Sequence, residues 1–539
     1  MSILTSAGPA QPGRPSSMNR TERRAAMAAA GVAEFGYRAA STASQEMAGW
    51  NVAQTSADGG WLWSRDTAVA RTYDLLQNEP WAQGGVDKKV DMVIGASWRP
   101  SISIDAEALG ITRDQAASLA REYERVYRGW ANDPLCRCDL EETLSAAFNM
   151  HLVVMQHEVA GDGVAVLRWK EDRGWAYRTA LQVIDADRLS NPMGRPETDQ
   201  LRGGVEKDAD GRPVAYHFRE AHPGDLLMGG AAKAYRWERV ARRQPWGRPQ
   251  VLHLYSKDRP GQTRGVSKLI AALARFKGLA RYAEAELGNA VMNALFAATI
   301  TSGFDPAVAE QHLTASATQS HHALREAFYE AAQPTLRGVR LQHLFPGDEL
   351  KFLTTGREAA GFAAFTQTFL RSIASGLGIT YEQLAGDWSQ VNYSSARAAL
   401  VEVWRGILKA RDRVAMMIAT PTLMAVLEDA IDGGQTSLPP GVDDLYAAPA
   451  TWLRVSWIGP ARGWVDPVKE AQAALMRIEA GLSNFELECA EQGVEFEENL
   501  QKLMTQNAQF EAAGIRPPSL AAMLTVKPRS DDPPAAEAA

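Results

Sequence analysis

A long apolar seam in the middle of the chain constrains the fold more than any other sequence feature. Charged residues lie off the seam, and its apolar members follow at intervals of 4, 3, 4, 3 and 4 residues: Leu269, Leu273, Phe276, Ala280, Ala283 and Leu287. Because an α-helix returns to the same face after three or four residues, this spacing predicts a helix over 268–297. A second seam predicts another helix over 357–376, and its members are Phe362, Phe365, Phe369 and Ile373.

The sequence before these helices changes its pattern once. Residues 20–132 are helical in pattern, with a capping box at Thr112, and a further helix is expected to end near Gly161. Residues 160–256 then form a β-rich module, in which turn signals separate short runs of β-branched and aromatic residues. The predicted strands are 164–169, 180–184, 214–218 and 251–255.

The sequence around and after the two helices is mixed. The segment 299–355 predicts a strand pair, 338–341 with 349–352, around the turn Pro346-Gly347-Asp348. A third long helix starts near Ser394, and Pro421 is expected to kink or interrupt it because proline removes a backbone donor. A strand at 452–457 and a helix at 467–480 follow. We therefore expect an α+β protein, with disordered polar segments at 1–17 and 516–539.

Composition limits the possible functions. Hydrophobic residues make up 45% of the 539 residues, enough for a large core, and the formal net charge is −7. Tight general binding to DNA is disfavoured, because such affinity comes from cationic side chains that displace counterions. Three cysteines are too few for a disulfide framework and fit a reducing compartment. We expect no signal peptide and no membrane span.

Most candidate chemistry fails on spacing. The run Gly265-Val266-Ser267 matches the start of the Gly-x-Ser-x-Gly motif that carries the nucleophile in hydrolases. Leu269 occupies the position of the second glycine, so we favour Ser267 as the N-cap of the following helix. Cys136 and Cys138 lack a second ligand pair at zinc spacing. No phosphate-binding loop is present, which excludes an ATP-driven motor. Three acidic residues near a strand suggest either turn caps or the magnesium ligands of a nuclease: Asp185, Asp187 and Asp199.

One segment, residues 233–248, is strongly basic. It carries six cationic residues, one acidic residue and the interleaved Trp237 and Trp246. Such a mixture can stack on and neutralise single-stranded nucleic acid. The alternative, which we favour, is a solvated loop that leads into the strand at Val251.

Several stretches resemble lambda-like phage portal proteins, and they occur in family order over about residues 60–480. They include Ser64-Arg65-Asp66, the run 211–217, the closer run 259–267, and the strongest one, 378–405. Each stretch alone is weak, whereas the ordered set is specific. The residues that carry the resemblance most directly are Gln262, Arg264, Gly265, Tyr381, Ser394, Ser395, Arg397, Trp404, Trp457, Trp464, Asp466 and Pro467.

The resemblance implies a portal-protein fold, without enzymatic activity, that closes into a ring of about twelve copies at one capsid vertex. Its parts would be a helical wing part (18–160), a β-rich wing module (161–266), two stem helices (267–298 and 356–377), a small α/β clip between them (299–355), a tunnel loop (378–393), a long kinked helix (394–432), and a wing and crown of strand and helices (450–515).

The resemblance also implies roles for residues. The part of the tunnel loop that approaches DNA would be Asp387, Trp388, Ser389, Gln390, Val391, Asn392 and Tyr393. The stem interface between subunits would use Leu269, Leu273, Phe276, Phe362, Phe365 and Phe369. The clip would dock terminase and then connector proteins through Phe345, Pro346, Gly347 and Asp348. It leaves open whether Arg264 and Arg397 meet DNA or pair between subunits.

The implied partners are other copies of the chain, the large terminase subunit, the major capsid and scaffold proteins, the head–tail connector proteins, and double-stranded DNA held weakly without sequence preference. No cofactor, metal or membrane is implied. The protein would assemble in the bacterial host cytoplasm and reside at the portal vertex of the virion. The alternatives are a helical head-completion or scaffold-type protein that forms no ring, and a metal-dependent nuclease.

Overall fold

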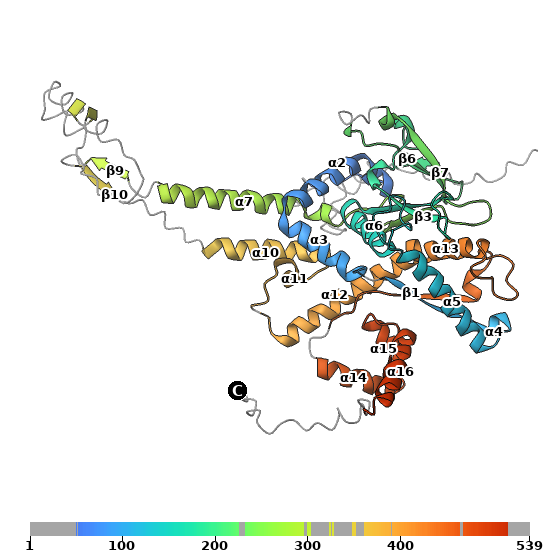
Figure 1. Ribbon diagram of the computed structural model, residues 1–539. Coiled ribbons are helices and arrows are strands. Elements are labelled where there is room, and N and C mark those ends of the chain that lie inside the picture. Colours follow the sequence, from blue (N-terminus) through green and yellow to red (C-terminus); the bar gives the residue numbers. More distant parts are fainter. Residues whose placement is uncertain are drawn as a thin grey trace, which may run out of the picture. The chain divides into compact units, whose positions relative to one another are not determined.

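The computed structural model describes residues 50, 52–96, 98–225, 232–295, 299–302, 323–324, 326–327, 348–351, 360–389, 391–463 and 467–515. The chain divides into two units, Met1–Ser56 and Ala57–Ala539. Every element named below belongs to the second unit, which combines helices with antiparallel sheets (Figure 1). The expected α+β class is therefore confirmed.

Two antiparallel sheets form the β-rich module. One has the order β3 (Thr179–Ile184), β2 (Asp162–Trp169), β8 (Val251–Tyr255), and the other has the order β4 (Leu201–Arg202), β5 (Val205–Lys207), β6 (Pro213–Arg219), β7 (Trp237–Ala241). Apolar side chains of both sheets, among them Val164 and Phe218, share one buried cluster. The four predicted strands are confirmed. Strand β7 was not predicted, and it corrects the expectation of a loop in the basic segment.

The helices before and beside this module are α2 (Ala57–Asn78), α3 (Pro80–Val93), α4 (Ala106–Leu109), α5 (Arg113–Ala131) and α6 (Ala146–Ala160). The predicted capping box is present, because the Thr112 side chain accepts from the Gln115 backbone N–H and the Gln115 side chain accepts from the Thr112 backbone N–H. Helix α6 ends at Gly161, whose φ of 86° lies in the left-handed region that favours glycine.

A strand interrupts the N-terminal region that the sequence pattern indicates to be helical. Strand β1 (Arg99–Ile104) pairs antiparallel with β11 (Leu453–Ile458), with Ile104 opposite Leu453. The pairing brings Trp98 against Trp457, with ring centroids 5.7 Å apart. The helical pattern predicted over 20–132 is therefore wrong at β1, because the partner strand of β1 lies more than 300 residues further along the chain.

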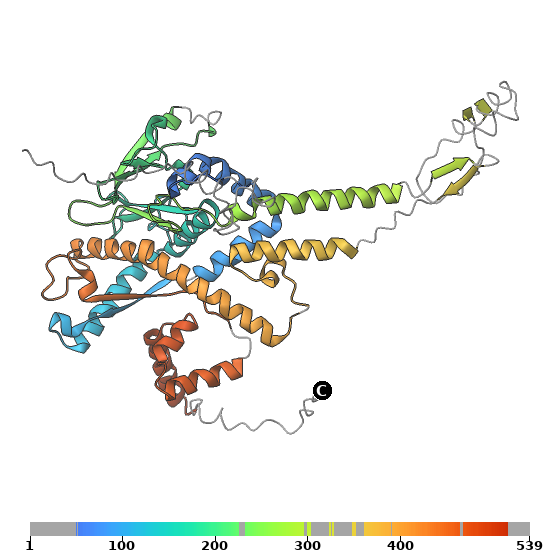
Figure 2. The same ribbon diagram turned by 180° about the vertical axis from the view of Figure 1, so that it is seen from behind.

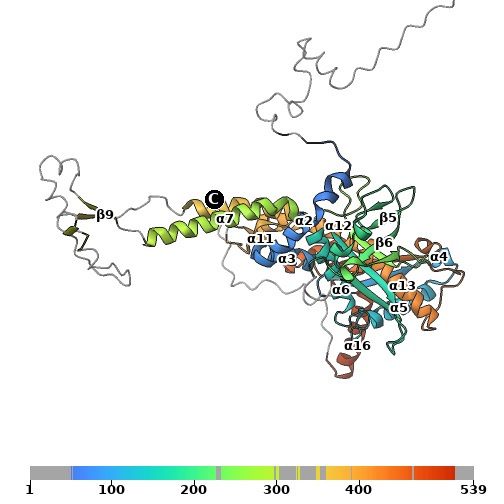
Figure 3. The ribbon, with the colours of Figure 1, turned by 90° about the horizontal axis from the view of Figure 1, so that it is seen from above.

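Helices α7 (Leu269–Leu295) and α10 (Ala360–Leu377) match the two predicted seams. They lie side by side and run in opposite directions (Figures 1, 2 and 3). The seam is buried only in its first half, since Leu269 and Phe276 are buried whereas Leu287 is 67% exposed.

The segment between the two helices is described at two strands. β9 (Thr299–Ser302) pairs antiparallel with β10 (Asp348–Lys351). The predicted partner of β10 was 338–341, which lies outside the described residues; the observed partner is β9.

The third predicted helix starts where it was expected, near Ser394. Helix α12 (Tyr393–Val414) continues through a π-helical turn, Ala415–Ala419, into α13 (Thr420–Asp432), and the short α11 (Tyr381–Ala385) precedes it. Pro421 does not end the helix. The wider turn just before it accommodates the missing backbone donor. By length and composition the run Ser394–Asp432 could cross a membrane, but 61% of its most apolar window is buried within the protein, as in a core helix.

The C-terminal helices are α14 (Pro467–Glu479), α15 (Phe485–Glu491) and α16 (Phe496–Ala512). None of the side chains within these three helices is buried. Carboxylates at the start of α16 pair with arginines of β1 and α5: Glu495 with Arg128 at 3.1 Å, Glu497 with Arg121 at 3.3 Å, and Glu498 with Arg99 at 3.4 Å. The predicted helix over 467–480 is confirmed by α14.

Candidate functional site

Within the family-like run 259–267, four consecutive residues between β8 and α7 are buried. We call them the strap: Gln262, Thr263, Arg264 and Gly265. Arg264 is 1% exposed. Its Nε donates to Asp162 at 2.8 Å, and its two terminal nitrogens donate to the carbonyl oxygens of Leu189, Gly203 and Ala186 at 2.7–2.8 Å. Arg264 therefore holds its own subunit together, and neither DNA nor a neighbouring subunit can reach it.

Asp162 is the centre of this network. It also accepts from the Gly265 backbone at 2.6 Å, faces His253 Nε2 at 2.9 Å, and lies 3.5 Å from Arg65. Burial by itself would raise the pKa of Asp162, but Arg264, His253 and Arg65 together hold that pKa below its usual range. The carboxylate stays charged inside the protein because every one of these donors is in place.

Gly265 lies against the backbone of Gly161. A Cβ at residue 265 would lie 1.8 Å from the Gly161 carbonyl oxygen, and Trp61 Nε1 donates to the Gly265 oxygen at 2.9 Å. No side chain fits at this contact between two backbones. The strap residues, which contribute to the family resemblance, therefore have a structural role within one subunit.

The predicted DNA-facing loop lies between α11 and α12. Trp388 is 46% exposed, and Asp387 accepts from the backbone and hydroxyl of Ser389, which lowers its pKa. Asn392 caps α12 by accepting from the Ser395 backbone at 2.9 Å, and Ser394 donates to the same side chain. Val391 is half-buried; Gln390 and the side chain of Tyr393 lie outside the described residues.

The start of α12 presents an open face. Arg397, Val401 and Arg405 are exposed on it, one helical turn apart from each other. Trp404 is half-buried and lies under the guanidinium of Arg411 at 4.7 Å. Tyr381 similarly packs under Arg371 at 5.3 Å. Arg397 remains available for a contact with DNA or with another subunit, unlike Arg264.

The predicted stem interface divides into two groups. Leu269 and Phe276 are buried in the core of their own subunit, and Leu273 is half-buried. The aromatic residues of α10 instead stack on Tyr282 of α7: Phe365 at 4.3 Å and Phe362 at 5.5 Å, with Phe369 a further 4.3 Å along from Phe365. This aromatic ladder reaches the surface, where Phe365 is 36% exposed.

Other predicted residues fall at the limits of the structure. Five of them lie outside the described residues: Phe345, Pro346, Gly347, Trp464 and Asp466. Asp348 begins β10 and Pro467 begins α14. Trp457 is half-buried against the core, and its Nε1 donates to Thr420 at 3.0 Å.

The three candidate nuclease carboxylates have separate partners. Asp185 caps a short 3₁₀ turn, Asp187 lies 3.3 Å from Arg65, and Asp199 lies 2.7 Å from Arg202. Within the described ranges no group of three or more His, Cys, Asp or Glu residues could hold a metal ion. Ser267 also has a structural role, since its hydroxyl donates to the Glu158 carbonyl and accepts from the Leu269 backbone.

The basic segment is divided by the fold. Arg239 pairs with Glu206, and the buried Arg248 pairs with Glu428 at 2.6 Å. Trp237 lies under Arg219, and Trp246 Nε1 donates to Glu428 at 2.7 Å. Trp237 is therefore engaged within the subunit, whereas Trp246 is 57% exposed. The ion pairs of Arg239 and Arg248 reduce the cationic surface on which the single-strand-binding hypothesis depends.

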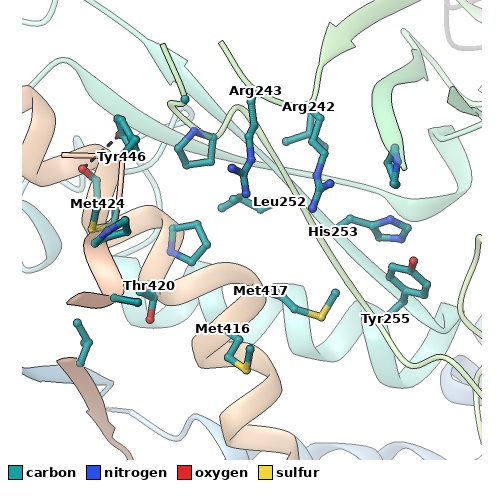
Figure 4. Close-up of a pocket in the computed structure, with 18 of the residues that line it drawn as sticks. Arg242, Arg243, Leu252, His253, Tyr255, Met416, Met417, Thr420, Met424 and Tyr446 are labelled. Atoms are coloured by element: carbon teal, nitrogen blue, oxygen red, sulfur yellow. Dashed lines mark hydrogen bonds between the residues drawn. The ribbon is translucent and has the colours of Figure 1, made fainter. Parts of the chain in front are cut away.

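Sequence reasoning missed a pocket of about 860 Å³ beside this segment. Arg242 and Arg243 line it on one side and Met416, Met417 and Tyr446 on another (Figure 4). These residues are up to about two hundred positions apart, so no local pattern connects them. The one available signal is the pair Met416-Met417 just before Pro421 in an otherwise regular apolar helix.

Comparison with known proteins identifies the class. The family described as phage portal protein, lambda family, matches residues 43–411. The chain is 31% identical over 486 residues to the portal protein of Escherichia phage N15, covering 88% of this chain and 90% of that one. Portal protein B of Escherichia phage lambda is 30% identical with the same coverage. The fold therefore belongs to a phage portal protein. This chain is a member of the lambda family of phage portal proteins, and its resemblance to that family is confirmed.

Solved structures give more distant similarities. A chain in the neck of an empty gene transfer agent particle has a TM-score of 0.47 and 17% identity, covering 80% of this chain and 94% of that one. A chain in the neck of the native particle has a TM-score of 0.40 and 15% identity, covering 80% and 99%.

Proposed function

We propose that this portal protein closes into a ring of about twelve copies at one capsid vertex and forms the channel for DNA packaging and ejection. The observation that carries the ring is the α7–α10 pair. Leu287 and Phe365 leave large apolar surfaces in solvent on a single subunit, and such surfaces generally mark a contact with another protein. Neighbouring subunits would cover them.

The loop and the α12 face supply the proposed DNA contact. Trp388, the exposed Arg397 and Arg405 are the groups that would line the channel. The formal charge of −7 per subunit keeps the attraction to phosphates weak, which suits DNA that must move. Nanomolar affinity for duplex DNA at about 150 mM salt would contradict this proposal.

The remaining regions would act in sequence during assembly. Segment 299–355, of which β9 and β10 are described, would dock the large terminase subunit and later the head–tail connector proteins. The β-rich module and the C-terminal helices would face the major capsid and scaffold proteins as wing and crown. The host bacterial cytoplasm would be the place of assembly and the virion vertex the final location.

Electron microscopy of the purified protein, together with its mass by light scattering, tests the ring. We expect rings with a central hole and a mass of about twelve subunits. A stable compact monomer with magnesium-dependent nuclease activity would overturn the proposal. As a variant test, Phe365→Asp places a charge in the aromatic ladder and should block assembly, whereas Lys277→Asp on the exposed side of α7 should not.

A further inference from the structure

The pocket missed by sequence reasoning, called here the Met–Arg pocket, lies between β8, the loop after β7, the π-helical turn and the segment around Tyr446 (Figure 4). Its volume of about 860 Å³ is in the range that accommodates several side chains of a bound ligand. The pocket uses none of the residues that we assign to the DNA channel or to the aromatic ladder.

Its charge is opposite to that of the chain. Three cationic residues line it, Arg242, Arg243 and Lys257, and its lining contains no Asp or Glu. No ion pair within the described part of the chain engages Arg242 or Arg243, although Arg239 and Arg248 of the same segment are both paired. In an acidic protein, two neighbouring arginines left without carboxylates are available for carboxylates from elsewhere.

Glu428, which bonds to Tyr446 of the pocket wall, is engaged by other donors. Glu428 receives hydrogen bonds from Arg248 at 2.6 Å, Tyr446 at 2.7 Å and Trp246 at 2.7 Å. These three donors occupy both of its carboxylate oxygens. The positive character of the pocket is thus maintained by the fold.

The other wall is apolar and adaptable. Met416 is 77% exposed, and Met417 and Met424 line the same wall. Unbranched methionine side chains adjust to the shape of an apolar group and are common at peptide-binding surfaces. Met416 and Met417 stand on the π-helical turn, and such single turns occur frequently at functional sites.

We propose that the Met–Arg pocket binds an acidic segment of another protein, in which carboxylates flank a large apolar side chain. Arg242, Arg243 and Lys257 would receive the carboxylates, and Met416 and Met417 would contact the apolar group. Tyr216 is buried, and the Tyr255 ring is stacked on His253 with centroids 4.4 Å apart. These rings are therefore poorly placed to stack on exposed bases, and a nucleic acid fits less well than a peptide.

A second copy of the chain also fits less well. The most acidic stretch of this protein is residues 484–515. Four of its carboxylates already pair within the subunit, and they are Glu488, Glu495, Glu497 and Glu498. The complementary segment is therefore expected on a different protein.

The test uses random 12-residue peptides displayed on yeast and selected against the full-length protein. Enriched peptides are then synthesised, and their binding is measured by fluorescence anisotropy. We expect sequences with at least two acidic residues beside Leu, Phe or Trp. Their affinity should fall about tenfold or more in R242E/R243E, the effect of losing buried charge pairs at an interface.

Two further variants separate the pocket from general charge. Met416→Asp, at an exposed position, should weaken the same peptides without disturbing the fold. The matched control K233E/R236E changes the net charge equally on exposed residues of the same segment that lie outside the pocket, and should bind as the wild type does.

Each other outcome overturns the proposal. Peptides that bind R242E/R243E as tightly as the wild type would place their site elsewhere. Enrichment without acidic residues would contradict the proposed ligand. If a labelled 20-nucleotide oligo-dT binds the wild type and loses that binding in R242E/R243E, the pocket is assigned to nucleic acid. A change in ring mass in R242E/R243E, without any peptide selected, would assign it to a contact between copies.

Discussion

The strap and the start of α12 both carry the residues by which this chain resembles its family, yet the structure places them in opposite environments. Arg264 is 1% exposed and makes four bonds within its subunit, whereas Arg397 stands on an open helix face. The difference shows that a family signature mixes two kinds of residue. One kind is fixed by the fold, and the other is left free for contacts with partners.

The two environments also differ in what a substitution does. Inside the strap each polar group depends on all its partners, so removing one leaves others buried and unsatisfied. On the α12 face water replaces a lost contact. Substitutions in the strap should therefore lower the free energy of unfolding more than substitutions on the α12 face. Substitutions on the α12 face should instead affect function more than stability.

Gly265→Ala is expected to have the largest effect on stability. The new methyl would lie 1.8 Å from the Gly161 oxygen and 2.6 Å from the Gly161 carbonyl carbon. Both atoms belong to the backbone, which cannot move aside without displacing α6 or the strap. We expect a loss of more than about 4 kcal/mol, or no folded protein. Urea unfolding measures it. The control Gly406→Ala, in the interior of α12 with open space around it, should stabilise by about 0.5–1 kcal/mol.

Arg264→Ala should have the next largest effect. It leaves Asp162 buried with incomplete pairing and removes the arginine donor from the carbonyl oxygens of Leu189, Gly203 and Ala186. Of these three, the Ala186 oxygen keeps a bond from Arg65 at 3.4 Å. Breaking a buried pair in this way costs about 3–5 kcal/mol. Arg454→Ala is the surface comparison, because Arg454 pairs with Asp105 at 3.2 Å but is 76% exposed, and it should change the free energy of unfolding by at most about 1 kcal/mol. Equal losses in the two variants would contradict the cost that we assign to breaking the buried pairing of Arg264.

Sequence predicted the parts of the fold that depend on local pattern. The seams gave α7 and α10 to within a few residues, and the capping box at Thr112 and the glycine end at Gly161 were correct. These features are set by neighbours three or four positions away. Strand β1 and the partner of β10 were missed, because each is stabilised by a strand far away in the chain.

The functional residues were predictable only in part, for the same reason. Resemblance singled out both Arg264 and Arg397 but gave no burial, and burial is what separates their roles. The Met–Arg pocket was not visible at all, since Arg242 and Met416 come together through tertiary packing. The basic segment looked uniform in sequence, whereas the fold pairs Arg239 and Arg248, and no carboxylate among the described residues pairs with Arg242 or Arg243.

A smaller effect, dependent on pH, is expected where α16 meets α5. Burial first, and then Glu495, raise the pKa of Glu124 to about 7. Its carboxyl accepts from the Ile102 backbone at 2.6 Å, and Arg128, which favours the charged form, lies beside it. The folded state therefore holds a proton that the unfolded state releases near pH 4.5, and this contribution is complete below pH 4.5 and lost as pH rises through about 7.

Glu124→Gln tests this contact, because Gln keeps the acceptor and cannot ionise. Wild type and variant should agree below about pH 4, where Glu124 is protonated in both states, while near pH 8 the wild type should be less stable by about 1–2 kcal/mol, a value reduced from about 1.4 kcal/mol per pKa unit by partial exposure. Hydrogen exchange of the α16 amides, corrected for intrinsic rates, measures the difference. A wild type that gains protection relative to the variant as pH rises would contradict the sign.

Trp388→Ala should have the smallest effect on stability and a clear effect on function. The indole is 46% exposed in the loop before α12, so the free energy of unfolding should change by less than about 0.5 kcal/mol. If the loop faces DNA in the ring, assembly should be normal and the amount of packaged DNA should fall. Ring mass by light scattering and DNA content of filled heads measure the two quantities. Trp63→Ala, at an indole 85% exposed on α2, is the matched control and should package normally. If Trp388→Ala instead prevents ring formation, the side chain belongs to a subunit interface, and the loop is not the DNA-facing element.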